Sequence, residues 1–333
     1  MIIPTLRISQ NPNDYKSLIR VCEDNTINTI RVNISRYNPC VYEKHIQIIR
    51  ELSSLSLDIM LDLPIPGCKN RLALGDKEEI NVYADLIYGF APLARCNKGE
   101  IPVQLDSIDK SIVAGDEIII GDGEASFVIE ERNEEVLYAR ALHNANLRGK
   151  RAFLITGFDN FHVCSDKESA TLIASISQIK PKYVVLSFSE SVLGLLHIEK
   201  TIHRILGTDC TIIPKIETRK GIDNLYEIFM HYPIAMLGRG DLALSNGLER
   251  FAENQNDALL KSMEIPKARF IVATDILTSL YLGRVPSRAD LTDLFYLHSM
   301  EVSSIVASAG LSLSETSFRL FCRYANVFNT KCI

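Results

Sequence analysis

The 333-residue sequence lacks several features that mark specialised classes of protein. None of its eight cysteines forms a C-x-x-C pair or lies near a histidine at the spacing of metal ligands. This excludes the common zinc motifs and indicates reduced thiols in a cytoplasmic protein. No apolar run approaches the roughly 20 residues of a membrane span, and the first residues lack the pattern of a signal peptide. We therefore expect a cytoplasmic protein with no membrane partner.

Long basic runs, internal repeats and low-complexity segments are also absent. The formal net charge is -5, which argues against nucleic acid as a partner. Hydrophobic residues make up 47% of the chain and charged residues 23%, so a sizeable core is expected. The length predicts one large domain or two ordinary ones.

Short apolar runs do recur, and most precede a longer segment with helical periodicity. Ser165 and Glu168 form a capping-box pattern at the start of one such segment. Eight strand-like runs, each leading into a helix, predict the α/β class and a parallel (β/α)8 TIM barrel. The predicted strands lie at 1–9, 28–35, 57–64, 182–189, 210–217, 233–244, 268–277 and 303–313. The predicted helices lie near 13–24, 41–56, 166–180, 191–206, 219–231, 251–263, 288–300 and 315–328.

Between about residues 72 and 157 this alternation stops. Short β-like segments at 101–108, 116–123, 125–132 and 135–142 take the place of helices, with Gly-Asp and Asp-Gly steps between them. We predict a small all-β cap domain inserted after the third strand. Residues 1–71 and 158–333 would form the barrel domain, and 72–157 the cap.

Polar residues gather where the predicted strands end, and a barrel places its functional site at these carboxyl ends. Lys215 and Glu217 stand two residues apart, so both project to the same face. Such a pair alone is more often a structural salt bridge, but several strand ends carry polar groups. Glu217 and Asp241 could hold Mg²⁺ through oxygen. Lys215 and Arg31 could meet a carboxylate or phosphoryl group. The full set is Arg31, Asn33, Ser35, Asp62, Lys215, Glu217, Arg239, Asp241 and Thr274.

Five motifs occur in the order known from one enzyme family. They are IRVNISR at 30–36, MLDLPIPGCK at 60–69, PKIETRKGIDNL at 214–225, MLGRGDLAL at 236–244 and FIVATDILTSLYLGRVPSRADLTDL at 270–294. These segments resemble the pyruvate kinase family. Within the insertion, AGDEIIIGDGEASFVIEE is similar to the cap domain of that family.

The resemblance implies a role for each matching residue. Lys215 would neutralise the phosphoryl group in transit, Arg31 would hold the phosphate, and Thr274 would face the enol carbon, so these three are the expected catalytic residues. The expected substrate-binding residues are Arg239, Gly240, Asp241 and Thr274. The expected metal ligands are Glu217 and Asp241 for Mg²⁺ or Mn²⁺, and Asn33, Ser35 and Asp62 for a monovalent cation such as K⁺. The expected nucleotide-binding residues are Arg36, Lys69, Lys150 and Arg151.

The implied activity is that of a pyruvate kinase-like phosphotransferase, an enzyme that moves a phosphoryl group between phosphoenolpyruvate and a nucleotide, ADP or ATP, with Mg²⁺. The resemblance also implies a cytoplasmic homo-oligomer, expected as a dimer. The sequence ends at Ile333, before any match to the regulatory C-terminal domain of the family, so we expect a truncated and divergent homologue.

Several positions depart from the family pattern, mostly on the nucleotide side. Arg and Lys differ in forked hydrogen bonding, so exchanges between basic residue types alter phosphate binding. The alternative is therefore a lyase or decarboxylase that acts on an oxaloacetate-like 2-oxo acid through the same metal and enolate site. A catalytically silent binding protein is disfavoured, because the charged set is complete. The departures are Arg36 for His, Pro64 for Lys, Gly67 for Glu, Lys69 for Arg, Glu190 near a lost Arg, and Asp275 for Gln.

Overall fold

The computed structural model describes residues 1–8, 12–34, 39–75, 78–105, 107–121, 123–156, 161–245, 247–283 and 285–329. The chain divides into two compact units. The barrel unit consists of Met1–Pro66, Cys164–Gly240 and Glu253–Ile333, and the cap unit consists of Gly67–Val163 and Asp241–Ala252. No helix among the described residues is long and apolar enough to cross a membrane.

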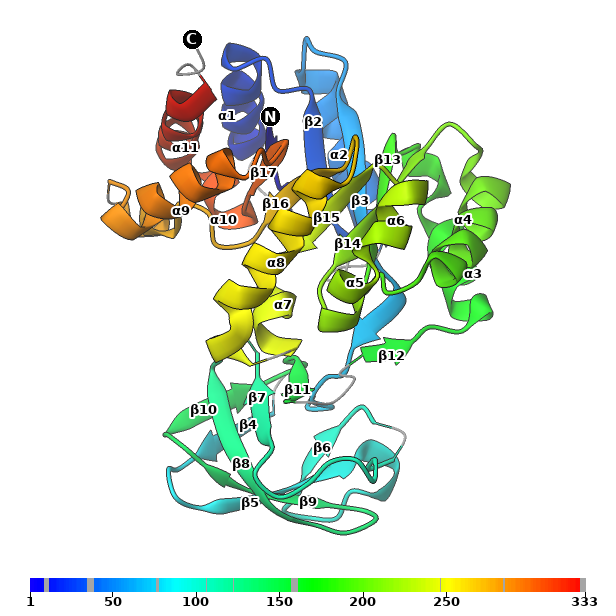
Figure 1. Ribbon diagram of the computed structural model, residues 1–333, viewed down its shortest axis with the longest axis vertical. Coiled ribbons are helices and arrows are strands. Elements are labelled where there is room, and N and C mark those ends of the chain that lie inside the picture. The colour runs from blue at the N-terminus through cyan, green and yellow to red at the C-terminus, as the bar shows by residue number, and fades with distance from the viewer. Residues whose placement is uncertain are drawn as a thin grey trace. The chain divides into compact units, whose positions relative to one another are not determined.

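Eight parallel strands form the barrel, which confirms the predicted α/β class and (β/α)8 architecture (Figure 1). Neighbours follow the order β1-β17-β16-β15-β14-β13-β3-β2, and a bridge between Thr5 and Arg31 joins β1 to β2. The strands are β1 (Ile2–Pro4), β2 (Thr29–Asn33), β3 (Asp58–Lys69), β13 (Tyr183–Ser187), β14 (Thr211–Ile216), β15 (Ile234–Gly238), β16 (Arg269–Ala273) and β17 (Ser304–Ala307).

Apolar side chains fill the interior of the barrel. Strand β14 is buried along its length after its first residue, as expected for a parallel strand that is covered on both faces. Seven of the strands contribute to one inner cluster, which closes the barrel as a packed core. Its buried members are Ile3, Met60, Val185, Ile213, Met236, Ile271, Ala273 and Val306.

The predicted helices follow the strands, and their starts agree with local capping signals. Ser165 and Glu168 form the expected capping box, and Ser287 with Asp290 forms a second one. The α-helices are α1 (Pro12–Asp24), α2 (Pro39–Leu52), α3 (Asp166–Ser175), α4 (Val192–Leu206), α5 (Arg219–Asp223), α6 (Leu225–His231), α7 (Arg239–Ser245), α8 (Phe251–Glu264), α9 (Arg288–Ser299), α10 (Ala309–Leu313) and α11 (Glu315–Asn329). Short 3₁₀ helices lie at Leu93–Arg95, Ser177–Ile179, Leu248–Arg250 and Thr278–Leu282.

Four predicted strands extend too far. The runs at 1–9 and 268–277 end as strands at Pro4 and Ala273, and in two other runs a helix replaces the second half. The run at 233–244 ends as a strand at Gly238, and α7 begins at Arg239. The run at 303–313 ends as a strand at Ala307, and the Ser308 side chain caps α10 by accepting from the N–H of Leu311. Apolar content alone does not separate a strand from the helix that follows it.

The cap unit is built mainly from β-strands, as predicted for an insertion after the third barrel strand. A six-stranded sheet has the order β11-β7-β8-β9-β5-β6, β4 pairs with β10, and β12 pairs with the end of β3. Phe90, Phe127 and Phe153 are buried in its core. The domain boundaries at 72 and 157 stay a prediction. The strands are β4 (Glu79–Val82), β5 (Ile87–Pro92), β6 (Ile101–Val103), β7 (Glu117–Ile120), β8 (Ala125–Arg132), β9 (Leu137–Ala141), β10 (Ala145–Arg148), β11 (Phe153–Ile155) and β12 (Phe161–Val163).

Candidate active site

Three buried charged residues and the partly buried Arg31 meet toward the carboxyl ends of the barrel strands. The Lys215 Nζ lies 3.0 Å from Glu217 Oε1 and 3.4 Å from Asp62 Oδ1. It also donates to the Ser187 hydroxyl at 3.4 Å. On the other side of Asp62, the Arg31 Nε donates to Oδ2 at 3.0 Å. Two cations and two carboxylates therefore form one electroneutral group, which we call the charge cluster (Arg31, Asp62, Lys215 and Glu217).

The parallel register brings these residues to one edge. Asn33 at the end of β2 stands opposite Asp62, and Leu186 on β13 stands opposite Pro214, the residue before Lys215. Because these two pairs of strands are parallel without a shift in register, the polar residues that follow each apolar run lie at the same height along the barrel axis. The i, i+2 spacing then directs Lys215 and Glu217 to the same face, as the sequence predicted.

The backbone at the end of β13 orients Glu217. Phe188 has φ +51°, a left-handed conformation that is uncommon for a bulky residue, and its N–H donates to Glu217 Oε2 at 3.0 Å. The Glu217 side chain is 1% exposed, so this bond and the Lys215 contact replace water for both oxygens. A strained residue that holds a buried carboxylate is typical of functional sites.

The charge cluster determines the protonation of Asp62. Burial by itself raises the pKa of this carboxyl group, but the Lys215 ammonium and the Arg31 guanidinium outweigh that effect. The pKa of Asp62 therefore lies below its ordinary value. Asp62 remains ionised, and both of its oxygens contact cationic side chains.

Gly238, the last residue of β15, leaves room for the charge cluster. A Cβ at this position would lie 2.8 Å from Glu217 Cγ and 3.1 Å from Lys215 Cε. The first contact is closer than real Cβ atoms show and the second is tighter than most, so a larger residue would displace Glu217. A glycine inside a strand often marks such a close approach.

Arg239 holds the turn that contains Thr274. Its guanidinium is buried and donates to the carbonyl oxygens of Thr274 at 2.9 Å and Asp275 at 2.7 Å. The carboxylate of Asp293 on α9 neutralises it, at 2.7 and 2.9 Å from Nη1. Thr274 has φ +80° and Asp275 +53°, so Arg239 stabilises two strained residues.

Gly240 lies beside Thr274 in the barrel unit. A Cβ on Gly240 would approach the Thr274 methyl carbon to 3.1 Å, which leaves little room for a side chain there. The side chain of Thr274 is exposed, as a substrate-facing group must be. A direct substrate contact by Arg239, Gly240 or Thr274 stays a prediction.

The remaining predicted residues belong to the cap unit or lie outside the described ranges. Lys69 and Asp241 form an ion pair within the cap unit. Arg151 is exposed and pairs with Glu124 at 2.9 Å, and Lys150 is also exposed. Ser35 and Arg36 fall in the range 35–38, outside the described residues. Binding of a nucleotide or a monovalent cation by these residues stays a prediction.

Sequence reasoning missed several residues that support the candidate site. Ser187 and Phe188 stand at the end of a predicted strand, but nothing in their identity indicates a contact with the charge cluster. The role of Gly238 could have been inferred from the sequence, because a glycine that ends an apolar strand indicates close packing. Asp293 had none, since its partner Arg239 lies 54 residues away in the chain.

No three His, Cys, Asp or Glu side chains among the described residues are grouped as a metal site. The donors present are carboxylates, of which Glu217 in the barrel unit and Asp241 in the cap unit are the predicted ligands. Mg²⁺ is usually held by one or two carboxylates together with substrate oxygens, rather than by an all-protein cage. The residues therefore fit Mg²⁺ in kind and do not fit a zinc site.

The fold and the charge cluster together define a (β/α)8-barrel protein with a group of paired charges toward the carboxyl ends of its strands. The family model described as "Pyruvate kinase, barrel domain" matches residues 2–297. The chain belongs to the pyruvate kinase family.

Curated relatives agree with this assignment. A pyruvate kinase of Thermoplasma acidophilum is 27% identical over 314 residues, which cover 93% of this chain and 52% of that protein. A pyruvate kinase of Pyrobaculum aerophilum is 24% identical over 284 residues, which cover 84% of this chain and 60% of that protein. The chain thus spans between about half and three-fifths of the length of these relatives.

Solved structures share the fold. The crystal structure of the Pyrobaculum aerophilum pyruvate kinase superposes with a TM-score of 0.78 at 21% identity, covering 97% of this chain and 72% of that one. A pyruvate kinase from Cryptosporidium parvum gives a TM-score of 0.80 at 21% identity, covering all of this chain and 69% of that one.

The charge cluster predicts a pH-dependent stability. We expect Asp62→Asn to lower the free energy of unfolding at pH 7 by about 3–5 kcal/mol, because it removes the buried negative charge that compensates Arg31 and, together with Glu217, Lys215. The folded-state pKa of Asp62 is lowered, so its contribution is present above the unfolded value near 3.8 and is lost as the pH falls through the folded value. The difference in the free energy of unfolding between the parent and Asp62→Asn should therefore become smaller as the pH falls below about 5.

Urea titrations of both proteins from pH 7 downward measure this difference. The exposed Asp209, changed to Asn, is the control and should follow the parent at every pH. A difference that stays constant into the acid range would contradict the assigned charge of Asp62.

Gly238 predicts a steric effect. We expect Gly238→Ala to lower the free energy of unfolding by about 1–3 kcal/mol, since the added methyl group overlaps Glu217 and Lys215. Gly75→Ala is the matched control, because its nearest contact would be an ordinary 3.4 Å. Equal melting temperatures for the two variants would rule out the close packing at Gly238.

Proposed function

We propose that this protein is a pyruvate kinase-like phosphotransferase, which moves a phosphoryl group between phosphoenolpyruvate and a nucleotide in a Mg²⁺-dependent reaction. Family membership supports the proposal. The observation that carries it is the position of Lys215, a buried ammonium held between two carboxylates at a strand end. Phosphoryl transfer needs mainly positioning and charge neutralisation, and Lys215 is suited to both.

Lys215 would stabilise charge that develops on the phosphoryl group. Its ammonium is held by Asp62, Glu217 and the Ser187 hydroxyl, so it needs no reorganisation when the reaction occurs. Preorganised electrostatic groups in water-poor surroundings contribute more to catalysis than the same groups in water. The Lys215 side chain is 11% exposed, so it is nearly shielded from bulk water.

Arg31 would hold the phosphate of the substrate. A guanidinium has five N–H donors. Asp62 accepts two of them and the Thr5 hydroxyl accepts one, at 3.1 Å. Within the described part of the chain no acceptor occupies the other two, and these can serve an anionic oxygen.

Glu217 and Asp241 would bind the divalent cation. When bound, Mg²⁺ neutralises charge on the substrate oxygens and orients them. Glu217 would supply Oε1 or Oε2 from the charge cluster, and Asp241 would supply its carboxylate after separating from Lys69. Both residues are carboxyl oxygen donors, the type that Mg²⁺ prefers.

The other parts of the hypothesis stay predictions. Both oxygens of Asp62 contact Arg31 or Lys215. A K⁺ ion bound by Asn33, Ser35 and Asp62 would therefore share the Asp62 carboxylate with two cationic side chains. Cytoplasmic location and a homodimer are likewise predicted. The relatives named above are pyruvate kinases, so the comparisons lend no support to a lyase.

A lactate dehydrogenase-coupled assay with phosphoenolpyruvate, Mg²⁺ and each nucleoside diphosphate tests the proposal. We expect turnover in the parent and a loss of about a hundredfold or more in Lys215→Met, the effect typical of removing one preorganised electrostatic group. Lys182→Met, at the opposite end of the neighbouring strand β13, is the matched control and should retain parental turnover.

Melting temperature is measured on the same samples, because Lys215→Met also removes a buried cation. A folded Lys215→Met protein with near-parental turnover would exclude the role given to Lys215. A parent without turnover on any nucleotide would exclude the kinase itself.

Lys69 predicts a change in metal affinity. Its ammonium pairs with Asp241, so it competes with a divalent cation for that carboxylate. We expect Lys69→Met to bind Mn²⁺ about two- to fivefold more tightly, since a partly exposed ion pair is worth about 1 kcal/mol or less. Calorimetry gives the affinity, and the exposed Lys98, changed to Met, serves as the control. Weaker Mn²⁺ binding by Lys69→Met would contradict this competition.

A further inference from the structure

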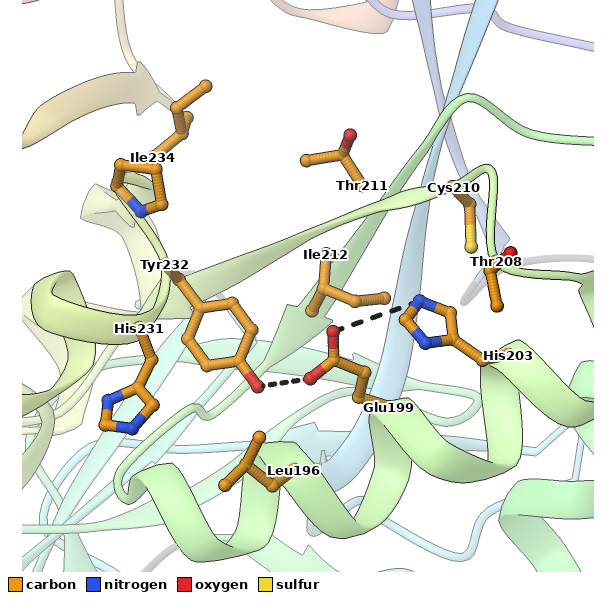
Figure 2. A pocket seen from close by; sticks show the side chains of 11 residues that line it. Leu196, Glu199, His203, Thr208, Cys210, Thr211, Ile212, His231, Tyr232 and Ile234 are labelled. Atoms are coloured by element: carbon orange, nitrogen blue, oxygen red, sulfur yellow. Dashed lines mark hydrogen bonds and ion pairs between the residues drawn. The ribbon is translucent and has the colours of Figure 1, made fainter.

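A cavity lies at the amino ends of β14 and β15, the opposite end of β14 from Lys215. Its volume is about 280 Å³, and it opens between α4 and the segments that enter β14 and β15 (Figure 2). All of its lining residues belong to the barrel unit. The volume is near the lower end of the range for small-molecule sites, so it suits a ligand of one or two rings.

The cavity carries a single acidic group. Glu199 on α4 projects into it between the rings of Tyr232 and His203 (Figure 2). The Tyr232 hydroxyl donates to Glu199 Oε2 at 2.8 Å, whereas His203 Nε2 stands 3.9 Å from Oε1, beyond hydrogen-bond distance. Among the residues that line the cavity there is no Lys or Arg, so its charge is negative when the histidines are neutral.

Tyr232 keeps the carboxylate in place. Burial raises the pKa of this phenol, and the hydrogen bond to Glu199 raises it further, so Tyr232 stays a donor over the whole physiological range. Glu199 Oε2 is therefore engaged, and Oε1 is the oxygen that can accept a bond from a ligand. Its side chain is 23% exposed, which gives it contact with the cavity.

The walls around this carboxylate are apolar. Leu196 from α4, Ile212 from β14 and Ile234 from β15 line the same cavity. Apolar walls with one charged group favour a flat ring that carries a hydrogen-bond donor of opposite charge. Phosphoenolpyruvate and nucleotides are anions, which Glu199 repels, so the cavity is not a second place for the proposed substrates.

We propose that this cavity is a binding site for a small, flat organic cation, such as an aromatic amidine or amine. The ring of the ligand packs on Leu196, Ile212 and Ile234, and its N–H groups donate to Glu199 Oε1. The site lies at the amino end of the strand whose carboxyl end carries Lys215, and its occupation requires neither substrate nor metal.

Benzamidine is the probe, and benzoate, which has the same size and shape but the opposite charge, is its matched counterpart. Protein labelled in the isoleucine δ1 methyl groups reports binding by NMR in the absence of Mg²⁺ and nucleotides. We expect benzamidine to shift the Ile212 and Ile234 methyl signals with a dissociation constant of about 1 mM or tighter. Benzoate should bind at least about tenfold more weakly, because it cannot donate to Glu199.

Two variants test the assigned contacts. Glu199→Gln should weaken benzamidine binding by about tenfold, the loss typical of a charge-assisted hydrogen bond. Glu227→Gln, the same change on the adjacent helix α6 outside the cavity, should leave the affinity unchanged. Thr208→Trp adds bulk at an exposed lining position and should weaken binding even if Glu199→Gln does not fold.

Three results would overturn the proposal. The first is benzoate binding as tightly as benzamidine, and the second is unshifted Ile212 and Ile234 signals at saturating benzamidine. The third is an affinity for benzamidine in Thr208→Trp and in folded Glu199→Gln equal to that of the Glu227→Gln control. Because no substrate or metal is present, these results do not depend on whether the protein transfers phosphoryl groups.

Discussion

Asp62 is the group on which the candidate site depends. It is a buried carboxylate that would be costly alone. Arg31 on the adjacent strand β2 and Lys215 on β14, one strand beyond β13, compensate its charge. This pairing holds Lys215 where it also reaches Glu217. The four charges sum to zero, so the barrel can bury them at the level where its strands end. In the proposed function, Lys215 and Arg31 would contact the anionic substrate.

Local strain accompanies this arrangement. Phe188 takes a left-handed conformation to donate its N–H to Glu217, and Thr274 and Asp275 are held in strained conformations by Arg239. Arg239 is itself neutralised by Asp293. A rigid barrel can maintain such residues because its packed core outweighs their cost. Strained backbone is thus found beside the charged residues, as expected where function requires fixed geometry.

The two ends of strand β14 have different chemistry. At the carboxyl end, Lys215 and Glu217 belong to the electroneutral charge cluster, where we propose that a phosphorylated acid and a metal bind. At the amino end, Ile212 forms part of an apolar cavity with the single carboxylate of Glu199. Under the two proposals, the first site would bind an anionic substrate and the second an organic cation. The two sites would then lie at opposite ends of one strand within the barrel unit.

The sequence by itself determined the eight-strand pattern, the β-rich insertion and the strand-end positions of Arg31, Asp62, Lys215 and Glu217. These follow from periodicity and spacing, which are local properties of the chain. Only the tertiary structure decided which charges pair, since Asp62 lies 153 residues from Lys215 in the chain. The close approach at Gly238, the neutralisation of Arg239 by Asp293 and the cavity at Glu199 arise in the same way. They depend on strands and helices that meet across long sequence separations, and no local pattern records such contacts.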